Sequence, residues 1–260
     1  MGTDISTAIH TARIKRTMTI DPPVHEPTAR VRVQEIGVAG MPLLRLLQLS
    51  SPSLPIGAFA YSQGLEQAVA LHWAFDEASA GHWIVGLLSH GLGRLDLPVL
   101  IRLHRAFADE DLVAFRRWNQ FLFASRGSSE LQAEDRHLGG ALARVLHGLG
   151  IEAASAWIAD PCATHAALFA LAAVRWNIQA TAMAAGYAFA WTEAQVGAAT
   201  RLCPLGQQAA QRILTRALPV IDGVVGEAFL LADDDLGASA PAHAIASALH
   251  ETLYSRLCRS

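Results

Sequence analysis

The carboxylate with the most unusual surroundings in this chain is Glu66, which ends the stretch SPSLPIGAFAYSQGLE. Pro52 and Pro55 restrict the residues before them to extended conformations, and Gly57 permits a sharp turn, so a preceding helix must end here. We expect a new helix to begin at about Ala58. That helix would hold Glu66 at a fixed position instead of on a loose loop.

A carboxylate held in this way has three open roles. It can pair with a basic group of a partner protein, or hold a water or a metal ion in transit. It can also cap a helix or pair with a basic group inside its own fold. The residue type and its position leave these roles undecided.

Several stretches resemble catalytic motifs but are incomplete. His250 and Glu251 begin like the zinc-protease pattern HExxH, but Tyr254 stands where the second histidine must be. The stretch LLSHG resembles a nucleophile elbow without its first glycine or its preceding strand. Lys15 is the only lysine, and no glycine-rich phosphate loop surrounds it. We therefore expect no catalytic residues and no hydrolysis of GTP or ATP by this chain alone.

The cysteines and histidines give only a weak indication of metal binding. Cys162 and His165 are spaced to lie on one helical turn, but two ligands do not complete a metal site. The alternative is a small apolar cysteine beside a partly buried histidine. The three cysteines are too few and too scattered for a disulfide framework, which fits a reducing, cytoplasmic setting.

The composition excludes some classes of protein. A net charge of -3 argues against nucleic-acid binding, which needs a basic face. The apolar runs at 166–174 and 178–191 fall short of the ~20 residues of a membrane span, and no signal peptide is evident. Only 17 % of the residues are charged, against about 25 % in typical soluble domains. Either partners cover part of the surface, or the chain has a plain alanine-rich core.

The apolar periodicity predicts an all-α fold, a single-domain bundle of roughly ten helices over residues 41–260. We expect residues 1–40 to form a mobile extension, because they contain prolines and mixed charges without a sustained apolar period. Asp76, Ser128 or Ser129, and Asp160 followed by proline are candidate helix starts. Pro219 is expected to break or kink a helix.

Two glutamines near the start of a late helix offer a second candidate site. Gln207 and Gln211 lie four residues apart, so their amides share one helical face. They can form an internal amide network or belong to an interface, and we weigh the two equally.

The C-terminal residues form a third candidate site. Tyr254, Leu257 and Cys258 have the spacing of a narrow apolar stripe on a helix, and Arg256 lies beside it. Such a tail can be mobile when free and bind a partner as a helix, with Tyr and Arg as typical anchors. The alternative is a tail that packs on its own chain at all times.

Four stretches, in order, resemble the urease accessory protein UreF family: LLRLLQLSSPSLPIGAFAYSQGLEQAV, WNQFLFASRGSSELQAEDRHLGGAL, CPLGQQAAQRIL and HETLYSRLCRS. The resemblance covers about residues 43–260. It departs from the usual family pattern at Gly127–Ser128, at Ala194 and at Cys258, which affects local contacts only.

The resemblance implies an all-helical, dimer-forming, non-catalytic factor of the cytoplasm. Such a factor binds UreD (also called UreH), recruits the GTPase UreG, in some members modulates its GTPase step, and supports nickel delivery to apo-urease. No cofactor would be bound stably, and nickel would pass transiently through the complex. The alternatives are an independent hydrolase or metal enzyme, or a nickel-storage protein, although no His or Cys cluster supports storage.

The resemblance also implies which residues contact partners or are functional. For Glu66 it favours the partner-facing role. The implied residues are Tyr61, Gln63, Gly64, Glu66, Gly206, Gln207, Gln211, Tyr254 and Arg256.

Overall fold

The computed structural model describes residues 40–237 and 240–260, which form helices and connecting loops without any β-strand. This confirms the expected all-α bundle of about ten helices. The α-helices are α1 (Met41–Leu49), α2 (Leu65–Ala70), α3 (Glu77–Leu87), α4 (Asp96–Ala108), α5 (Leu112–Ala124), α6 (Ser129–Gly148), α7 (His165–Arg175), α8 (Ala180–Leu202), α9 (Gln207–Leu230) and α10 (Pro241–His250). The short 3₁₀ or π helices are η2 (Ala58–Ala60), η3 (Leu88–Leu92), η4 (Glu152–Trp157) and η5 (Asp233–Asp235). The expected mobile extension lies almost wholly outside the described residues.

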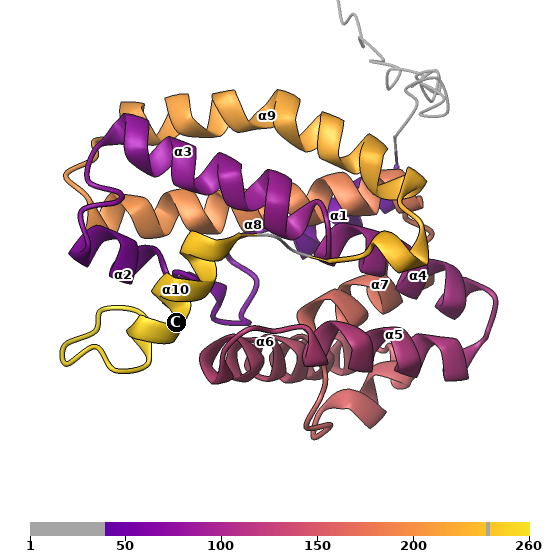
Figure 1. Cartoon of the computed structure of the whole chain (residues 1–260). Helices are drawn as coiled ribbons and strands as arrows, with labels where there is room; N and C mark the ends of the chain where they lie inside the picture. The colour runs from indigo at the N-terminus through magenta and orange to yellow at the C-terminus, as the bar shows by residue number, and fades with distance from the viewer. Residues whose placement is uncertain (1–39, 238–239) are drawn as a thin grey trace, which may run out of the picture.

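The helices form two groups joined by α4. In Figure 1, α3, α8 and α9 lie along one another in the upper half, and α5, α6 and α7 lie below them. Helix α4 contacts members of both groups, and α10 packs on the short helix α2. The C-terminal residues leave α10 on the same side as α2 and α6, which brings three distant parts of the sequence together (Figure 1).

The core is made largely of small side chains. All eight residues from Ala166 to Ala173 on α7 are buried, and five of them are alanine. Alanine allows helix axes to approach closely, so α7 packs tightly against α4 and α6. The low charge content of the sequence therefore reflects, at least in part, this alanine-rich interior.

Local capping explains where several helices begin. The side chain of Asp76 accepts a hydrogen bond from the Ser79 amide at 2.8 Å, and Ser79 bonds back to the Asp76 amide, which completes a capping box for α3. Ser128, rather than Ser129, caps α6. Pro219 lies inside α9, which continues to Leu230, so it does not end that helix.

The expected helix start at Asp160 is wrong, because α7 begins five residues later. Thr164 is its N-cap, and the Asn119 side chain of α5 accepts hydrogen bonds from the Thr164 amide and hydroxyl at 3.0 and 2.8 Å. Asp160 instead accepts a bond from the Cys162 amide within a turn. The contact with α5 fixes the chain at Thr164, and a local pattern cannot reveal such a partner.

The expected helix start at Ala58 is also wrong. Only the 3₁₀ turn η2 forms there, after which Tyr61 is extended and Gln63 and Gly64 have positive φ angles of 50° and 78°. Helix α2 begins at Leu65. A Cβ atom on Gly64 would lie 3.2 Å from the Ser247 amide nitrogen, so glycine serves both the left-handed backbone and the close approach of α10.

Within the described ranges, no single helix is long and apolar enough to cross a membrane. The segments Glu77–Leu92 and Asp96–Ala108 reach that length and composition only together, with a 43° bend between them.

Candidate functional site

Glu66 lies on α2, buried beneath the C-terminal residues. One carboxylate oxygen accepts a hydrogen bond from the Leu257 amide at 2.7 Å, and the other from the Cys258 amide at 2.8 Å. The second oxygen is also 3.3 Å from Nε2 of His250. Glu66 is thus engaged within its own fold, and it attaches the last residues of the chain to α2.

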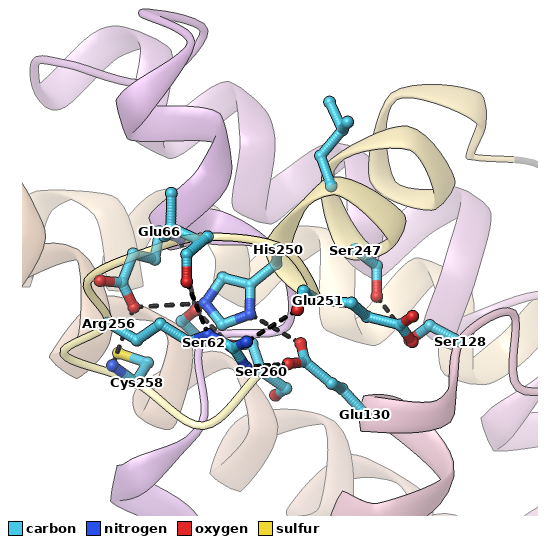
Figure 2. A network of polar contacts seen from close by, with 12 residues as sticks. Ser62, Glu66, Ser128, Glu130, Ser247, His250, Glu251, Arg256, Cys258 and Ser260 are labelled. Carbon is cyan, nitrogen blue, oxygen red and sulfur yellow. Dashed lines mark hydrogen bonds and ion pairs between the residues drawn. The ribbon is translucent and has the colours of Figure 1, made fainter.

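His250 is fully buried between two carboxylates, as Figure 2 shows. Its Nδ1 is 2.6 Å from Glu130 of α6, and its Nε2 faces Glu66 of α2. Each ring nitrogen of His250 thus faces a carboxylate oxygen from a different helix. The ring therefore connects the end of α10 to two other helices.

Arg256 completes this network from the tail side (Figure 2). Its guanidinium contacts Glu130 at 2.5 Å and donates to the carbonyl oxygens of Glu251 at 2.7 Å and Leu253 at 3.1 Å. All of these partners of the Arg256 side chain belong to its own chain. Arg256 thus holds the turn that follows α10.

The expected helical stripe of Tyr254, Leu257 and Cys258 is not formed. Residues after His250 adopt turns and irregular structure. Cys258 is buried at 5 % exposure, whereas Leu257 is 80 % exposed and Tyr254 is fully exposed. The physical reason is competition for the backbone, since Glu66 takes two tail amides and Arg256 takes two carbonyls that a helix would have used.

The end of the tail is packed on its own chain. Cys258 and Ser260 are buried, and the Ser260 hydroxyl donates to Glu134 of α6 at 2.8 Å. The main-chain oxygen of Ser260 accepts bonds from the amide and hydroxyl of Ser62 at 2.9 and 2.5 Å. This geometry favours the alternative of a self-packed tail for these residues, while Tyr254 and Leu257 are left outside it.

Gln63 connects the tail network to α8. Its amide nitrogen donates to Glu134 at 2.7 Å, and its oxygen accepts from Nε1 of Trp191 at 2.8 Å. Glu134 is buried, and burial raises its pKa to about 7 despite the bonds from Gln63 and Ser260. Glu134 is therefore a carboxyl group that changes charge close to neutral pH.

A cavity of about 340 Å³ lies behind Gln63 and Glu134. Its polar lining includes an ion triad in which Arg126 contacts Asp96 and Asp135, both at 2.6 Å. His165 also faces this cavity, and burial together with Arg126 lowers its pKa to about 4.

Of the suggested pair of metal ligands, Cys162 and His165, His165 lines the cavity. Nε2 of His165 has no hydrogen-bond partner in the structure. Among the described residues, no group of three or more His, Cys, Asp or Glu side chains is arranged to hold a metal ion. The structure therefore adds no further ligands to the pair.

The remaining candidate residues lie in three places. Tyr61 is buried against α6, where its hydroxyl is 3.0 Å from Nδ1 of His137. Gly64 is the N-cap of α2, and Gly206 is the N-cap of α9. Gln207 and Gln211 are exposed on the first turns of α9, and no hydrogen bond joins their side chains. The internal amide network considered for these two glutamines is not formed.

Sequence reasoning missed part of the polar network that holds the tail. His250 drew attention only through an incomplete zinc motif, and Glu130 and Glu134 were not singled out. A usable signal existed on α6, since Glu130 and Glu134 lie four residues apart and share a face with Leu131 and Leu138, which are buried. Carboxylates beside a buried apolar face indicate a polar partner inside the fold.

Comparison with known proteins gives concordant results. A family model described as UreF matches residues 74–218. A protein named urease accessory protein UreF from Chromohalobacter salexigens is 48 % identical over 219 residues, covering 84 % of this chain and 94 % of the relative. The protein of the same name from Alkalilimnicola ehrlichii is 45 % identical over 221 residues, covering 85 % and 97 %. A protein named urease accessory protein UreF 2 from Brucella anthropi is 44 % identical over 220 residues, covering 85 % and 97 %.

Proposed function

The chain belongs to the UreF family of urease accessory proteins, and on that basis we propose that it is a non-catalytic scaffold in a nickel-delivery complex. Membership of the family implies a role in urease maturation. The proposed partners are UreD, the GTPase UreG and apo-urease, in the cytoplasm, with two copies of this chain in the complex.

The observation that carries the proposal is the fixed conformation of the C-terminal tail. Glu66, His250 and Arg256 hold residues 251–260 in an irregular path through several hydrogen bonds. In that path the side chains of Tyr254 and Leu257 are exposed, and none of the described residues covers them. Ordered, exposed aromatic and aliphatic side chains are typical anchors for a protein partner, because little conformational entropy remains to be lost on binding.

Helix α10, which precedes the tail, also exposes apolar side chains. Ile245 is 52 % exposed and Leu249 is 44 % exposed. They lie four residues apart and therefore share one face of the helix. We assign the exposed apolar side chains of α10 and of the tail to contact with UreD or UreG.

Nickel enters the proposal as cargo and not as a resident cofactor. The cavity beside Glu134 and His165 offers carboxylate and imidazole groups, which are nickel ligands by type. The described residues provide no closed set of ligands there. We therefore propose that nickel passes through the complex, and that this chain positions the partners that carry it.

The test is co-purification of UreD and UreG, expressed together with and without this chain. We expect UreG to be retained on tagged UreD only when this chain is present. The isolated chain should show no GTPase activity, and light scattering should detect two copies in the complex. Equal retention of UreG on UreD without this chain would overturn the scaffold role.

A further inference from the structure

A second recess shares Ile56, Phe59 and Tyr61 with the lining of the cavity. It has a volume of about 570 Å³ and lies between α6, the bend at residues 56–61 and the loop at 158–161. We call it the arginine cleft, because Arg136, Arg144 and Arg259 line it together with His137.

The arginine cleft has an excess of positive charge in a chain whose net charge is -3. Arg136, Arg144 and Arg259 are exposed, and none of them pairs with a carboxylate in the described part of the chain. The one carboxylate in the lining, Asp160, is engaged with Arg116 at 3.4 Å and with the Cys162 amide. No carboxylate of the described residues therefore neutralises these three guanidinium groups, although the Arg259 side chain lies against Tyr61.

The spacing of the arginines suits an anion that carries several charges. Arg136 and Arg144 lie eight residues apart on α6, which places their Cα atoms about 12 Å apart along the helix. Alternate side chains of an extended peptide are about 7 Å apart, so such a peptide can offer a separate carboxylate to each guanidinium group.

The rest of the cleft is apolar and suits the same kind of ligand. Ile56, Phe59, Ile158 and Pro161 line it, and Phe59 is 71 % exposed. A surface that combines arginines with an aromatic ring matches a segment in which acidic residues surround an apolar one.

The arginine cleft is connected to the tail. The Arg259 amide donates to the carbonyl oxygen of Ala60 at 2.8 Å, and its neighbours Cys258 and Ser260 are held by Glu66, Ser62 and Glu134. Arg259 therefore reaches the cleft only when the tail is packed.

We propose that the arginine cleft binds an acidic segment of a protein partner in the maturation complex, and that packing of the tail completes this site. The inference rests on the proposed scaffold function, because it takes the occupant from that complex. It adds the chemistry of the contact, which is several carboxylates around an apolar side chain.

The first experiment measures binding of a fluorescent peptide, Glu-Glu-Glu-Leu-Glu-Glu-Glu, to the full chain at low salt. Arg136→Glu/Arg144→Glu should weaken binding at least tenfold, because repulsion replaces two ion pairs. The matched control, Arg105→Glu/Arg117→Glu, changes the net charge equally at exposed positions on α4 and α5 and should stay within about threefold. Melting curves should show that both variants fold. Equal loss in both variants, or no loss in either, would overturn the proposal.

Further arms of the experiment distinguish other occupants. Inorganic phosphate at equal concentration should not displace the peptide, and full displacement would indicate a small-anion site. Residues 1–39 contain Asp4, Asp21, Glu26 and Glu35. If deleting that segment increases peptide affinity tenfold, the occupant is the chain itself and not a partner.

The second experiment applies the two double variants to assembly with UreD and UreG. We expect the cleft variant to form less complex than the control, with a difference that shrinks as salt increases. If the wild type also fails to assemble, the scaffold function fails, while the peptide result still decides the chemistry of the cleft. If both double variants assemble as the wild type does, the cleft does not serve this complex.

Discussion

Two buried ionic networks of similar chemistry lie near Glu134, which interacts with Arg126 and Asp135 of one and bonds to Ser260 beside the other. In the triad, Arg126 pairs with Asp96 and Asp135, and these carboxylates belong to the long core helices α4 and α6. In the tail network, Glu66 and Glu130 surround His250 and bind a segment without regular structure. The triad joins elements that also have large apolar contacts, whereas the tail has few.

The difference shows that the effect of an ion pair on stability depends on the other contacts that hold the paired elements. Removal of the Arg126 charge leaves the carboxylates of Asp96 and Asp135 uncompensated inside the core. Removal of a charged side chain from the tail network lets residues 251–260 detach into water. Water then solvates the polar groups that remain. We therefore expect the triad to control global stability and the tail network to control binding. The following variants test that contrast, from the largest expected change in melting temperature to the smallest.

Arg126→Met should give the largest loss of stability. Asp96 and Asp135 would remain buried without a cation, which costs about 3–5 kcal/mol. Thermal denaturation should show a decrease of about 10 °C or more at neutral pH. Arg117→Met, an exposed arginine on α5, is the control and should change little. If Arg126→Met melts at the same temperature as the wild type, the triad does not stabilise the fold.

Glu134→Gln should make stability less dependent on pH. The folded-state pKa of about 7 lies above the usual value of 4.5, so the folded protein binds more protons between these limits. The wild type should therefore lose stability as pH rises from about 4.5 to 7, by up to about 3 kcal/mol, and then level off. The glutamine variant should lack this decrease and melt higher than the wild type at pH 8. Parallel pH profiles for both proteins would contradict the assignment.

Glu66→Ala should change global stability less than Arg126→Met. It leaves the Leu257 and Cys258 amides without their acceptor, but a detached tail regains bonds to water, so the cost is about 1–3 kcal/mol. Hydrogen exchange should become fast at residues 251–260 and stay slow in α7. Asp222→Ala, on the exposed face of α9, is the control. Slow exchange in the tail of Glu66→Ala would contradict the anchoring role of Glu66.

The sequence predicts the α-helical class and the capped starts of α3 and α6, because these depend on residues within one turn. The start of α7 could not be predicted, since the Asn119 side chain that fixes Thr164 lies 45 positions earlier. The tail conformation fails for the same reason, because Glu66 lies 191 positions before Leu257. Local spacing indicated a helix with an apolar stripe, and a distant buried carboxylate overrides that preference. The residues around the bend and the C-terminal spacing identified Glu66 and Arg256 as candidates, and the family resemblance supported both. That both hold the tail through contacts inside the fold became apparent only in three dimensions.

Arg256→Ala should change the melting temperature least and therefore tests the contrast most strictly. The side chain is 37 % exposed, and a loss of its contacts with Glu130 and two carbonyl oxygens is partly replaced by water. We expect a melting temperature within about 2 °C of the wild type, because a surface ion pair contributes about 0–1 kcal/mol.

In Arg256→Ala the turn that presents Tyr254 would lose its internal support, so binding of a partner would have to offset the entropy cost of ordering the tail. Complex formation with UreD and UreG at equal concentration should then weaken by about tenfold to thirtyfold. Arg256→Lys separates charge from geometry, since lysine keeps the positive charge but replaces the planar guanidinium fork with a compact ammonium group. If Arg256→Lys assembles like the wild type, the charge alone is sufficient. If Arg256→Ala also assembles like the wild type, the tail network is purely structural, and the proposed contrast with the triad fails.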